Sequence, residues 1–190
     1  MSAVAYEQGS LEWLRARAFK FTGTDGGVVE GKNPWKTPEQ LTREKVRAMV
    51  SADTGEDLNE FEMNDAVMHG QIMEPIAKGW FEATYGYKVI ETGLVSHSEI
   101  DWLSASPDGL IGMIDGLEIK CPFYSKVYSV YDKPSYLIQC HIVMEVCDLE
   151  QIHFVCYKQK EPHHKAETLV EKIDRNPYFL DEELPGSYMP

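Results

Sequence analysis

The 190-residue chain has little cysteine, and its cysteines form no metal-binding or redox motif. Cys121, Cys140, Cys147 and Cys156 are widely spaced, and no two of them make a Cys-x-x-Cys pair. This spacing excludes the common zinc and dithiol sites. The apolar neighbours of these residues favour reduced thiols packed in a core.

The sequence also has no long apolar run. A helix that spans a bilayer needs about 20 consecutive apolar residues, and no stretch approaches that length. The first residues lack the basic, apolar and small-residue order of a secretion signal. We therefore expect a cytoplasmic protein that makes no membrane contact.

Positive charge is scarce overall but locally concentrated. The chain has 18 Lys and Arg against 31 Asp and Glu, a net charge of −13, which argues weakly against a nucleic-acid partner. Residues 15–47 nevertheless hold eight basic and four acidic residues, whereas residues 48–77 hold seven acidic residues and no Lys or Arg. An acidic protein that binds a polyanion must concentrate positive charge somewhere, and the basic segment is the candidate.

No internal repeat, low-complexity tract or linker divides the sequence, so we expect one domain over residues 1–190. The hydrophobic patterns predict an α/β (α+β) fold, with a helical N-terminal part and a central mixed β-sheet flanked by helices. Expected helices cover 10–19 (Ser10 as N-cap), 38–50, 59–87 (kinked or restarted at Pro75, ended by Gly86), 135–147 and 166–174. Expected strands cover 88–96, 101–105, 110–114, 117–121 and 151–158, and residues 22–35 read as a loop.

One expected hairpin carries charged residues inside an apolar run. It is 104-SASPDGLIGMIDGLEIKCPF-123, in which Asp115-Gly116 is a strong turn signal. Residues two apart in a strand share a face, so Glu118 and Lys120 point the same way. The turn can bring Asp108 towards Glu118.

Two neighbouring carboxylates repel one another, and a divalent cation removes that repulsion. A lysine beside such a cation can orient or deprotonate water, or stabilise a pentavalent phosphorus. This combination suits metal-assisted phosphodiester hydrolysis. The alternative is structural: Glu118 and Lys120 form a cross-strand surface pair, and Asp108 is a turn residue. The residues by themselves leave both readings open.

The hairpin resembles the core of the PD-(D/E)xK nuclease superfamily, and more closely that of the phage lambda exonuclease or YqaJ-type viral recombinase family. Three further blocks are similar to that family and occur in its order. They are 7-EQGSLEWLRARAFKFTGTD-25, 70-GQIMEPIA-77 and 136-YLIQCHIVMEV-146. The resemblance implies a restriction-endonuclease-like core.

The resemblance also implies roles for individual residues. Asp108, Glu118, the Ile119 carbonyl and Glu74 would hold two magnesium ions, for which manganese could substitute, and Lys120 would position the attacking water. The implied 5′-phosphate and DNA contacts are Arg17, Thr24, Ser106 and Gln139. Thr24 stands where the family often has serine, and both offer a hydroxyl. Val67 and Met68 are our candidates for an apolar wedge that separates the strands.

The implied activity is a metal-dependent 5′→3′ exonuclease that acts on double-stranded DNA ends. It would leave 3′ overhangs for a single-strand annealing recombinase protein, in a ring-shaped homotrimer encoded by a phage or prophage. Two alternatives stay open on the same fold: an endonuclease or repair nuclease, and a non-catalytic DNA-end-binding module. A protein without a nucleic-acid role would need the four blocks to agree by chance.

Overall fold

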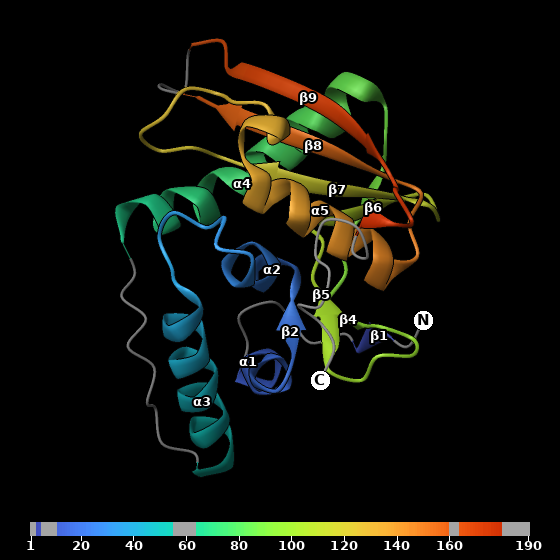
Figure 1. Ribbon diagram of the computed structural model, residues 1–190. Helices are drawn as coiled ribbons and strands as arrows, with labels where there is room; N and C mark the ends of the chain where they lie inside the picture. The colour runs from blue at the N-terminus through green and yellow to red at the C-terminus, as the bar shows by residue number, and fades with distance from the viewer. Residues whose placement is uncertain (1–2, 5–10, 55–63, 160–163, 180–190) are drawn as a thin grey trace.

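The computed structural model describes residues 3–4, 11–54, 64–159 and 164–179 (Figure 1). The helices are α1 (Leu11–Ala18), α2 (Gly23–Val29), α3 (Pro38–Thr54), α4 (Asp65–Tyr85), the 3-10 helix η1 (Val130–Asp132) and α5 (Pro134–Cys147). The strands are β1 (Ala3–Val4), β2 (Phe21–Thr22), β3 (Val89–Ile90), β4 (Leu94–Ser96), β5 (Leu103–Ala105), β6 (Gly109–Ile111), β7 (Asp115–Lys120), β8 (Gln151–Lys158) and β9 (Glu167–Asp174). The expected Ser10 cap and residues 59–63 lie outside the described residues.

The strands form two sheets with helices packed between and over them. The larger sheet has the order β3-β6-β7-β8-β9, with β7 and β8 parallel and the other pairs antiparallel. The smaller sheet has the order β1-β4-β5-β2. Helix α5 lies between the sheets, and α4 covers the opposite face of the larger one (Figure 1). The expected α+β fold with mixed sheets and flanking helices is confirmed.

Strand β7 shows how the sequence pattern places the charged residues. Leu117 and Ile119 are buried in the cluster that α4 contributes to through Ala77 and Phe81. Glu118 points the other way, where Gln139 of α5 contacts it. The expected alternation along this strand is therefore confirmed.

The turn of the hairpin is not where the sequence pattern placed it. Asp115 and Gly116 belong to β7 and pair with Ile111 and Leu110, so the turn lies at residues 112–114. Gly112 has φ 64°, a conformation that glycine adopts without strain. Gly116 serves packing instead, because a Cβ there would stand 2.8 Å from Leu149 Cδ1.

Two further expectations about elements are wrong. Residues 22–35 are not all loop, because Gly23–Val29 form α2, with Thr22 as its N-cap. Residues 166–174 form no helix but the edge strand β9, which pairs with β8 along its length. Leu169 and Val170 are neighbours in sequence and pack against different core clusters, which is the alternation of a strand.

The segment 88–96 is divided rather than continuous. β3 joins the larger sheet and β4 the smaller one, so this segment changes sheets at residues 91–93. Helix α4 runs through Pro75 as one element and ends at Gly86, which has φ 72°, as expected of a helix stop. None of the described helices has the length and apolar character needed to cross a membrane.

Candidate active site

Asp108 lies where β6 begins and is held over the end of β7. Its Oδ2 accepts a hydrogen bond of 2.7 Å from the backbone N–H of Ile119. A residue's N–H and C=O point to the same side of a strand, so the Ile119 carbonyl also faces the Asp108 side. The ladder between β6 and β7 would next place Pro107 opposite Ile119, and proline has no N–H to donate. The ladder therefore leaves this carbonyl available to another partner.

Glu118 is almost fully buried, at 1% exposure, and only one of its oxygens is bonded. Oε1 accepts hydrogen bonds from Lys120 Nζ and, at 2.6 Å, from Gln139 Nε2. Oε2 is buried and has no hydrogen-bond partner. A buried carboxylate oxygen without a partner is costly, and a cation is one group that would satisfy it.

Lys120 is the lysine that pairs directly with Glu118, and the charge of Lys78 on α4 also acts on Asp108 and Glu74. Besides its bond to Glu118, Lys120 Nζ lies 4.9 Å from the centroid of the Tyr136 ring on α5. Burial lowers the pKa of Lys120, but the charges of Glu118 and Asp108 outweigh it and raise this pKa above its ordinary value. Lys120 is therefore held as an ammonium group at neutral pH.

The three carboxyl groups of the cluster resist ionisation together. Burial raises the pKa of Glu118 to about 7, against the opposing charge of Lys120. Burial also raises the pKa of Asp108, and both burial and the charge of Asp108 raise the pKa of Glu74 on α4. Glu74 therefore interacts electrostatically with Asp108 and Glu118 of the hairpin, although no hydrogen bond joins it to either acid.

The donor set suits a hard divalent cation. Within the described ranges, no three His, Cys, Asp or Glu side chains converge as a complete set of metal ligands. Two carboxylates and a carbonyl are nevertheless what Mg²⁺ commonly takes from a protein, since it keeps several waters. Asp108, Glu118 and the Ile119 carbonyl fit this pattern, and Glu74 fits a position reached through water.

The N-terminal block forms a second polar cluster. Arg17, at the end of α1, donates from Nη2 to the hydroxyl oxygens of Thr22 at 3.2 Å and Thr24 at 3.0 Å. Thr24 is exposed in the first turn of α2. Two of the four expected 5′-phosphate residues, Arg17 and Thr24, are therefore in direct contact.

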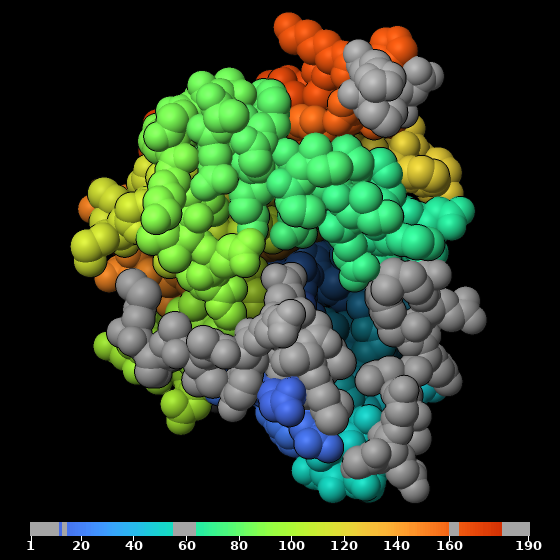
Figure 2. Space-filling view, turned by 180° about the vertical axis from the view of Figure 1, so that it is seen from behind, coloured from blue at the N-terminus to red at the C-terminus, as the bar shows by residue number. Residues whose placement is uncertain are grey.

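The two clusters meet at Gly23. A Cβ at this position would stand 3.3 Å from Gln139 Cγ, so the start of α2 packs against the residue that bonds Glu118. Strands β2 and β5 are parallel, with Thr22 opposite Ser104, so they lead in the same direction to Thr24 and Ser106. Ser106 Oγ is buried without a hydrogen-bond partner. Figure 2 shows this side of the molecule hollowed between α4 and α3, with α2 at the floor.

Val67 and Met68, our wedge candidates, lie in the first turn of α4. The Val67 N–H donates a hydrogen bond to the side chain of Asn64, the N-cap of α4, and the Met68 side chain is 46% exposed. Glu74 follows about 9 Å further along the helix axis, at 1.5 Å per residue. Nothing in the structure brings either residue against the acidic cluster, so their role stays a prediction.

Sequence reasoning missed Thr22, Asp25 and Tyr136. Thr22 links Arg17 to Asp25, and Tyr136 lies under Lys120. A signal for the first two was present, because Thr22-Gly-Thr-Asp25 has the Ser/Thr-x-x-acid spacing of a helix start. Tyr136 opens the 136-YLIQCHIVMEV-146 block that resembles the family, but only the packing of α5 brings its ring to Lys120.

Comparison with solved structures gives neighbours over nearly the whole chain. An alkaline exonuclease (LHK-Exo) from Laribacter hongkongensis is 27% identical with a TM-score of 0.71, and the match covers 91% of this chain and 86% of that one. The same enzyme in complex with dAMP matches equally well in TM-score. A phage-related exonuclease from Haemophilus somnus, 17% identical, shares the fold with a TM-score of 0.60 over 85% of this chain and 87% of that one.

Comparison with curated proteins gives relatives of unassigned function. An uncharacterized protein of Acanthamoeba polyphaga mimivirus is 29% identical over 175 residues, which is 82% of this chain and 30% of that protein. The Bacillus subtilis protein YqaJ is 30% identical over 106 residues, or 55% of this chain and 31% of that one. This chain thus spans about a third of the length of these relatives.

The model of the YqaJ-like viral recombinase domain matches residues 12–150. That range contains both polar clusters, from Arg17 to Gln139, and strand β8, which pairs with β7, begins just after it. The chain belongs to the YqaJ-like viral recombinase domain family.

Proposed function

We propose that this chain is a metal-dependent exonuclease that digests one strand of double-stranded DNA from its 5′ end. The observation that carries the proposal is the contact between the two polar clusters. Gly23 of the Arg17–Thr24 cluster packs on Gln139, and Gln139 bonds Glu118 of the acidic cluster. A group that recognises a terminal phosphate thus adjoins a group suited to cleave a nearby phosphodiester.

Each cluster has a distinct task in this proposal. Arg17, Thr24 and Ser106 offer the guanidinium and hydroxyl donors that a terminal phosphate prefers. Asp108, Glu118 and the Ile119 carbonyl would hold Mg²⁺, or Mn²⁺ in its place, and Glu74 would complete a second site. The bound cations would polarise the phosphodiester and lower the pKa of the attacking water.

Lys120 would act as a charged donor rather than as a base. Its ammonium group is held between Glu118 and the Tyr136 ring, and the acids keep it protonated. It can therefore orient the attacking water and stabilise negative charge on the phosphorus oxygens. Gln139 fixes the Glu118 carboxylate from the side of α5.

The products and partners of the reaction follow from the same proposal. Digestion from the 5′ end leaves a 3′ overhang, on which a single-strand annealing recombinase protein would load. We further propose a homotrimeric ring around the DNA. Sedimentation equilibrium tests this, and a mass equal to the 21.7 kDa of one chain would rule the ring out.

The first test uses linear duplex DNA with Mg²⁺, carrying either a 5′-phosphate or a 5′-hydroxyl. We expect rapid loss of the phosphorylated strand from its 5′ end, and no loss with Lys120→Ala. The matched control is Lys172→Ala, which removes an exposed lysine on β9 and should leave the activity in place. Digestion that ignores the end group would discard the phosphate pocket, and inactivity in both Mg²⁺ and Mn²⁺ would leave only a DNA-binding role.

A further inference from the structure

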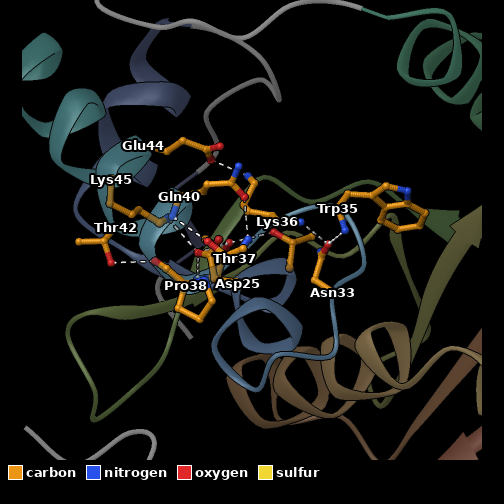
Figure 3. Close-up of polar contacts among 12 residues, drawn as sticks. Asp25, Asn33, Trp35, Lys36, Thr37, Pro38, Gln40, Thr42, Glu44 and Lys45 are labelled. Carbon is orange, nitrogen blue, oxygen red and sulfur yellow. Dashed lines mark hydrogen bonds and ion pairs between the residues drawn. The ribbon is translucent and has the colours of Figure 1, made fainter.

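A partly buried ion pair lies next to the Arg17–Thr24 cluster. Asp25 is 7% exposed, and its Oδ2 forms an ion pair of 2.8 Å with Lys45 Nζ of α3. Lys45 also donates a hydrogen bond of 2.7 Å to the backbone carbonyl of Lys20, between α1 and β2. Figure 3 shows Asp25 and Lys45 pointing towards one another beside α3. The pair thus joins three segments around Arg17.

Asp25 fixes the hydroxyl that Arg17 contacts. Its Oδ2 accepts hydrogen bonds from the Thr22 backbone N–H at 2.8 Å and from the Thr22 hydroxyl at 2.9 Å. A hydroxyl has one hydrogen, so a Thr22 hydroxyl that donates to Asp25 presents lone pairs to Arg17. Arg17 Nη2 donates to that oxygen at 3.2 Å. Asp25 therefore determines which way this chain of hydrogen bonds runs.

Lys45 pairs with the carboxylate whose charge acts on Arg17. Only the Thr22 hydroxyl separates the Arg17 guanidinium from the Asp25 carboxylate. Burial lowers the pKa of Arg17, and the charge of Asp25 partly opposes this effect. Without Lys45, an uncompensated buried carboxylate would attract Arg17 and compete with any anion that Arg17 binds.

We propose that Asp25 and Lys45 are positioning residues that set Arg17, Thr22 and Thr24 for a terminal phosphate. The inference rests on the proposed function and extends it to a chain of contacts that we call the relay. The relay consists of the Lys45–Asp25 ion pair and the hydrogen bonds from Thr22 to Asp25 and from Arg17 to Thr22. Asp25 orients the hydroxyls, and Lys45 cancels the charge of Asp25 so that Arg17 faces the substrate. Neither residue contacts the reacting atoms.

The experiment measures the phosphate preference, which is the ratio between 5′-phosphate and 5′-hydroxyl ends, first in binding and then in turnover. Fluorescence anisotropy gives the Kd of duplex ends with a 5′-phosphate or a 5′-hydroxyl in EDTA, where no cleavage occurs, and steady-state kinetics in Mg²⁺ gives kcat and KM. The variants are Lys45→Met, Lys45→Arg, Asp25→Asn and the double variant Asp25→Asn/Lys45→Met. Lys36→Met is the matched control, because Lys36 lies in the same region but pairs with Glu44, at 2.5 Å, rather than with Asp25.

For Lys45→Met we expect the phosphate preference to fall by about tenfold, the loss of one charged hydrogen bond. The fall should come through KM for phosphorylated ends, with kcat on hydroxyl ends unchanged. Asp25→Asn should lose preference too, Lys45→Arg should keep it, and the double variant should recover part of the loss because both charges are gone. Lys36→Met should weaken both ends equally.

The outcomes separate this inference from the proposed function. If the wild type digests DNA and prefers phosphate while Lys45→Met keeps that preference, the relay is wrong and the exonuclease stands. The relay is also wrong if Lys45→Met weakens both ends equally, as Lys36→Met should, because Lys45 then contributes only general positive charge to DNA binding. A wild type that prefers phosphate in EDTA but does not cleave, with that preference lost in Lys45→Met, supports the relay and refutes the nuclease.

Discussion

Glu118 is the residue at which burial and charge conflict most. It is a carboxyl group at 1% exposure with one unbonded oxygen, in a cluster that also contains Asp108 and Glu74. The ammonium groups of Lys120 and Lys78 act on these three carboxyl groups, and Lys78 also pairs with Glu91. The conflict explains why burial raises the pKa of Glu118 to about 7, and why a divalent cation would stabilise the fold as well as the reaction.

Removing this carboxylate should abolish stabilisation by cations. A cation at about 100 times its Kd contributes about 2.7 kcal/mol, which for this chain length is about 5–10 °C in Tm. We expect Mg²⁺ or Mn²⁺ to raise the Tm of the wild type by that amount and EDTA to reverse it. Glu118→Gln should show little shift. Glu171→Gln is the control, because it alters a half-buried carboxylate that is bonded to Ser129, and it should keep the full shift in Tm. An equal shift in Glu118→Gln would show that the metal binds at another site.

His141 makes stability depend on pH. Burial lowers the pKa of His141 to about 4, and its ring stacks on Phe179 with centroids 3.8 Å apart. The unfolded chain binds a proton near pH 6.5, while the folded chain excludes it until about pH 4. Stability from this group is complete above pH 6.5 and is lost as pH falls towards 4.

The test compares Tm between pH 7 and pH 5 for the wild type and His141→Phe, which keeps an aromatic ring on Phe179. The wild type should lose more Tm than the variant on acidification. Glu118 acts in the opposite direction, because its raised pKa favours the folded state as pH falls below 7. Only the difference between the two proteins therefore reports His141, and parallel curves would show that this ring does not titrate in the folded protein as described.

At the scale of elements, the contact of α2 with α5 assembles the site. A Cβ at Gly27 would stand 2.6 Å from Ser135 Cβ and 2.8 Å from Ser135 Cα. Gly27 thus permits α2 to approach α5 closely enough for Gly23 to reach Gln139. Helix propensity alone would make alanine more stable than glycine at this position by up to about 1 kcal/mol. The clash of a Cβ with the Ser135 backbone outweighs this gain, so we expect a net loss of stability.

We expect Gly27→Ala to destabilise the fold by about 1–3 kcal/mol through overpacking. It should also reduce the preference for 5′-phosphate ends, because α2 carries Thr24 away from Gln139. Urea unfolding and end-preference assays measure the two effects. Gly79→Ala in α4 is the control, since nothing lies within 4 Å of its Cβ position, and it should be neutral or stabilising. A Gly27→Ala protein as stable as the wild type would show that α2 can shift without cost.

At the scale of the whole molecule, an acidic protein must hold a polyanion through a local surface. The net charge is −13, while residues 15–47 carry eight of the 18 basic residues. Contacts through these residues would be mostly to phosphate and would release counterions. Binding would then depend strongly on salt and little on base sequence.

We expect digestion of linear duplex DNA to slow by about tenfold or more when salt rises from about 50 to 200 mM, as a few phosphate contacts are screened. Supercoiled circular DNA should stay intact at every salt concentration, because it has no end. Gel analysis with both substrates in one tube gives the comparison. A rate that is insensitive to salt would contradict the basic-segment surface, and cleavage of the circle would favour an endonuclease.

Sequence by itself determined the elements whose signals are local. The apolar stretches of α5 and β8 were located within one residue, because period and length distinguish a buried helix from a buried strand. The alternation of β7 separated Glu118 from Leu117 and Ile119. The chemistry of the motifs predicted which acids, lysine and phosphate-binding residues to examine, and the family match agrees with the resemblance that named them.

Tertiary structure decided what depends on partners distant in the sequence. Residues 167–174 form β9 because they pair with the edge of β8, and Gly116 belongs to β7 because it pairs with Leu110 of β6 and Ile152 of β8. The contact between Gly23 and Gln139, and the ion pair of Asp25 with Lys45, join segments that no local pattern relates. Local periodicity determines which face a side chain takes, whereas close packing between elements determines which faces meet.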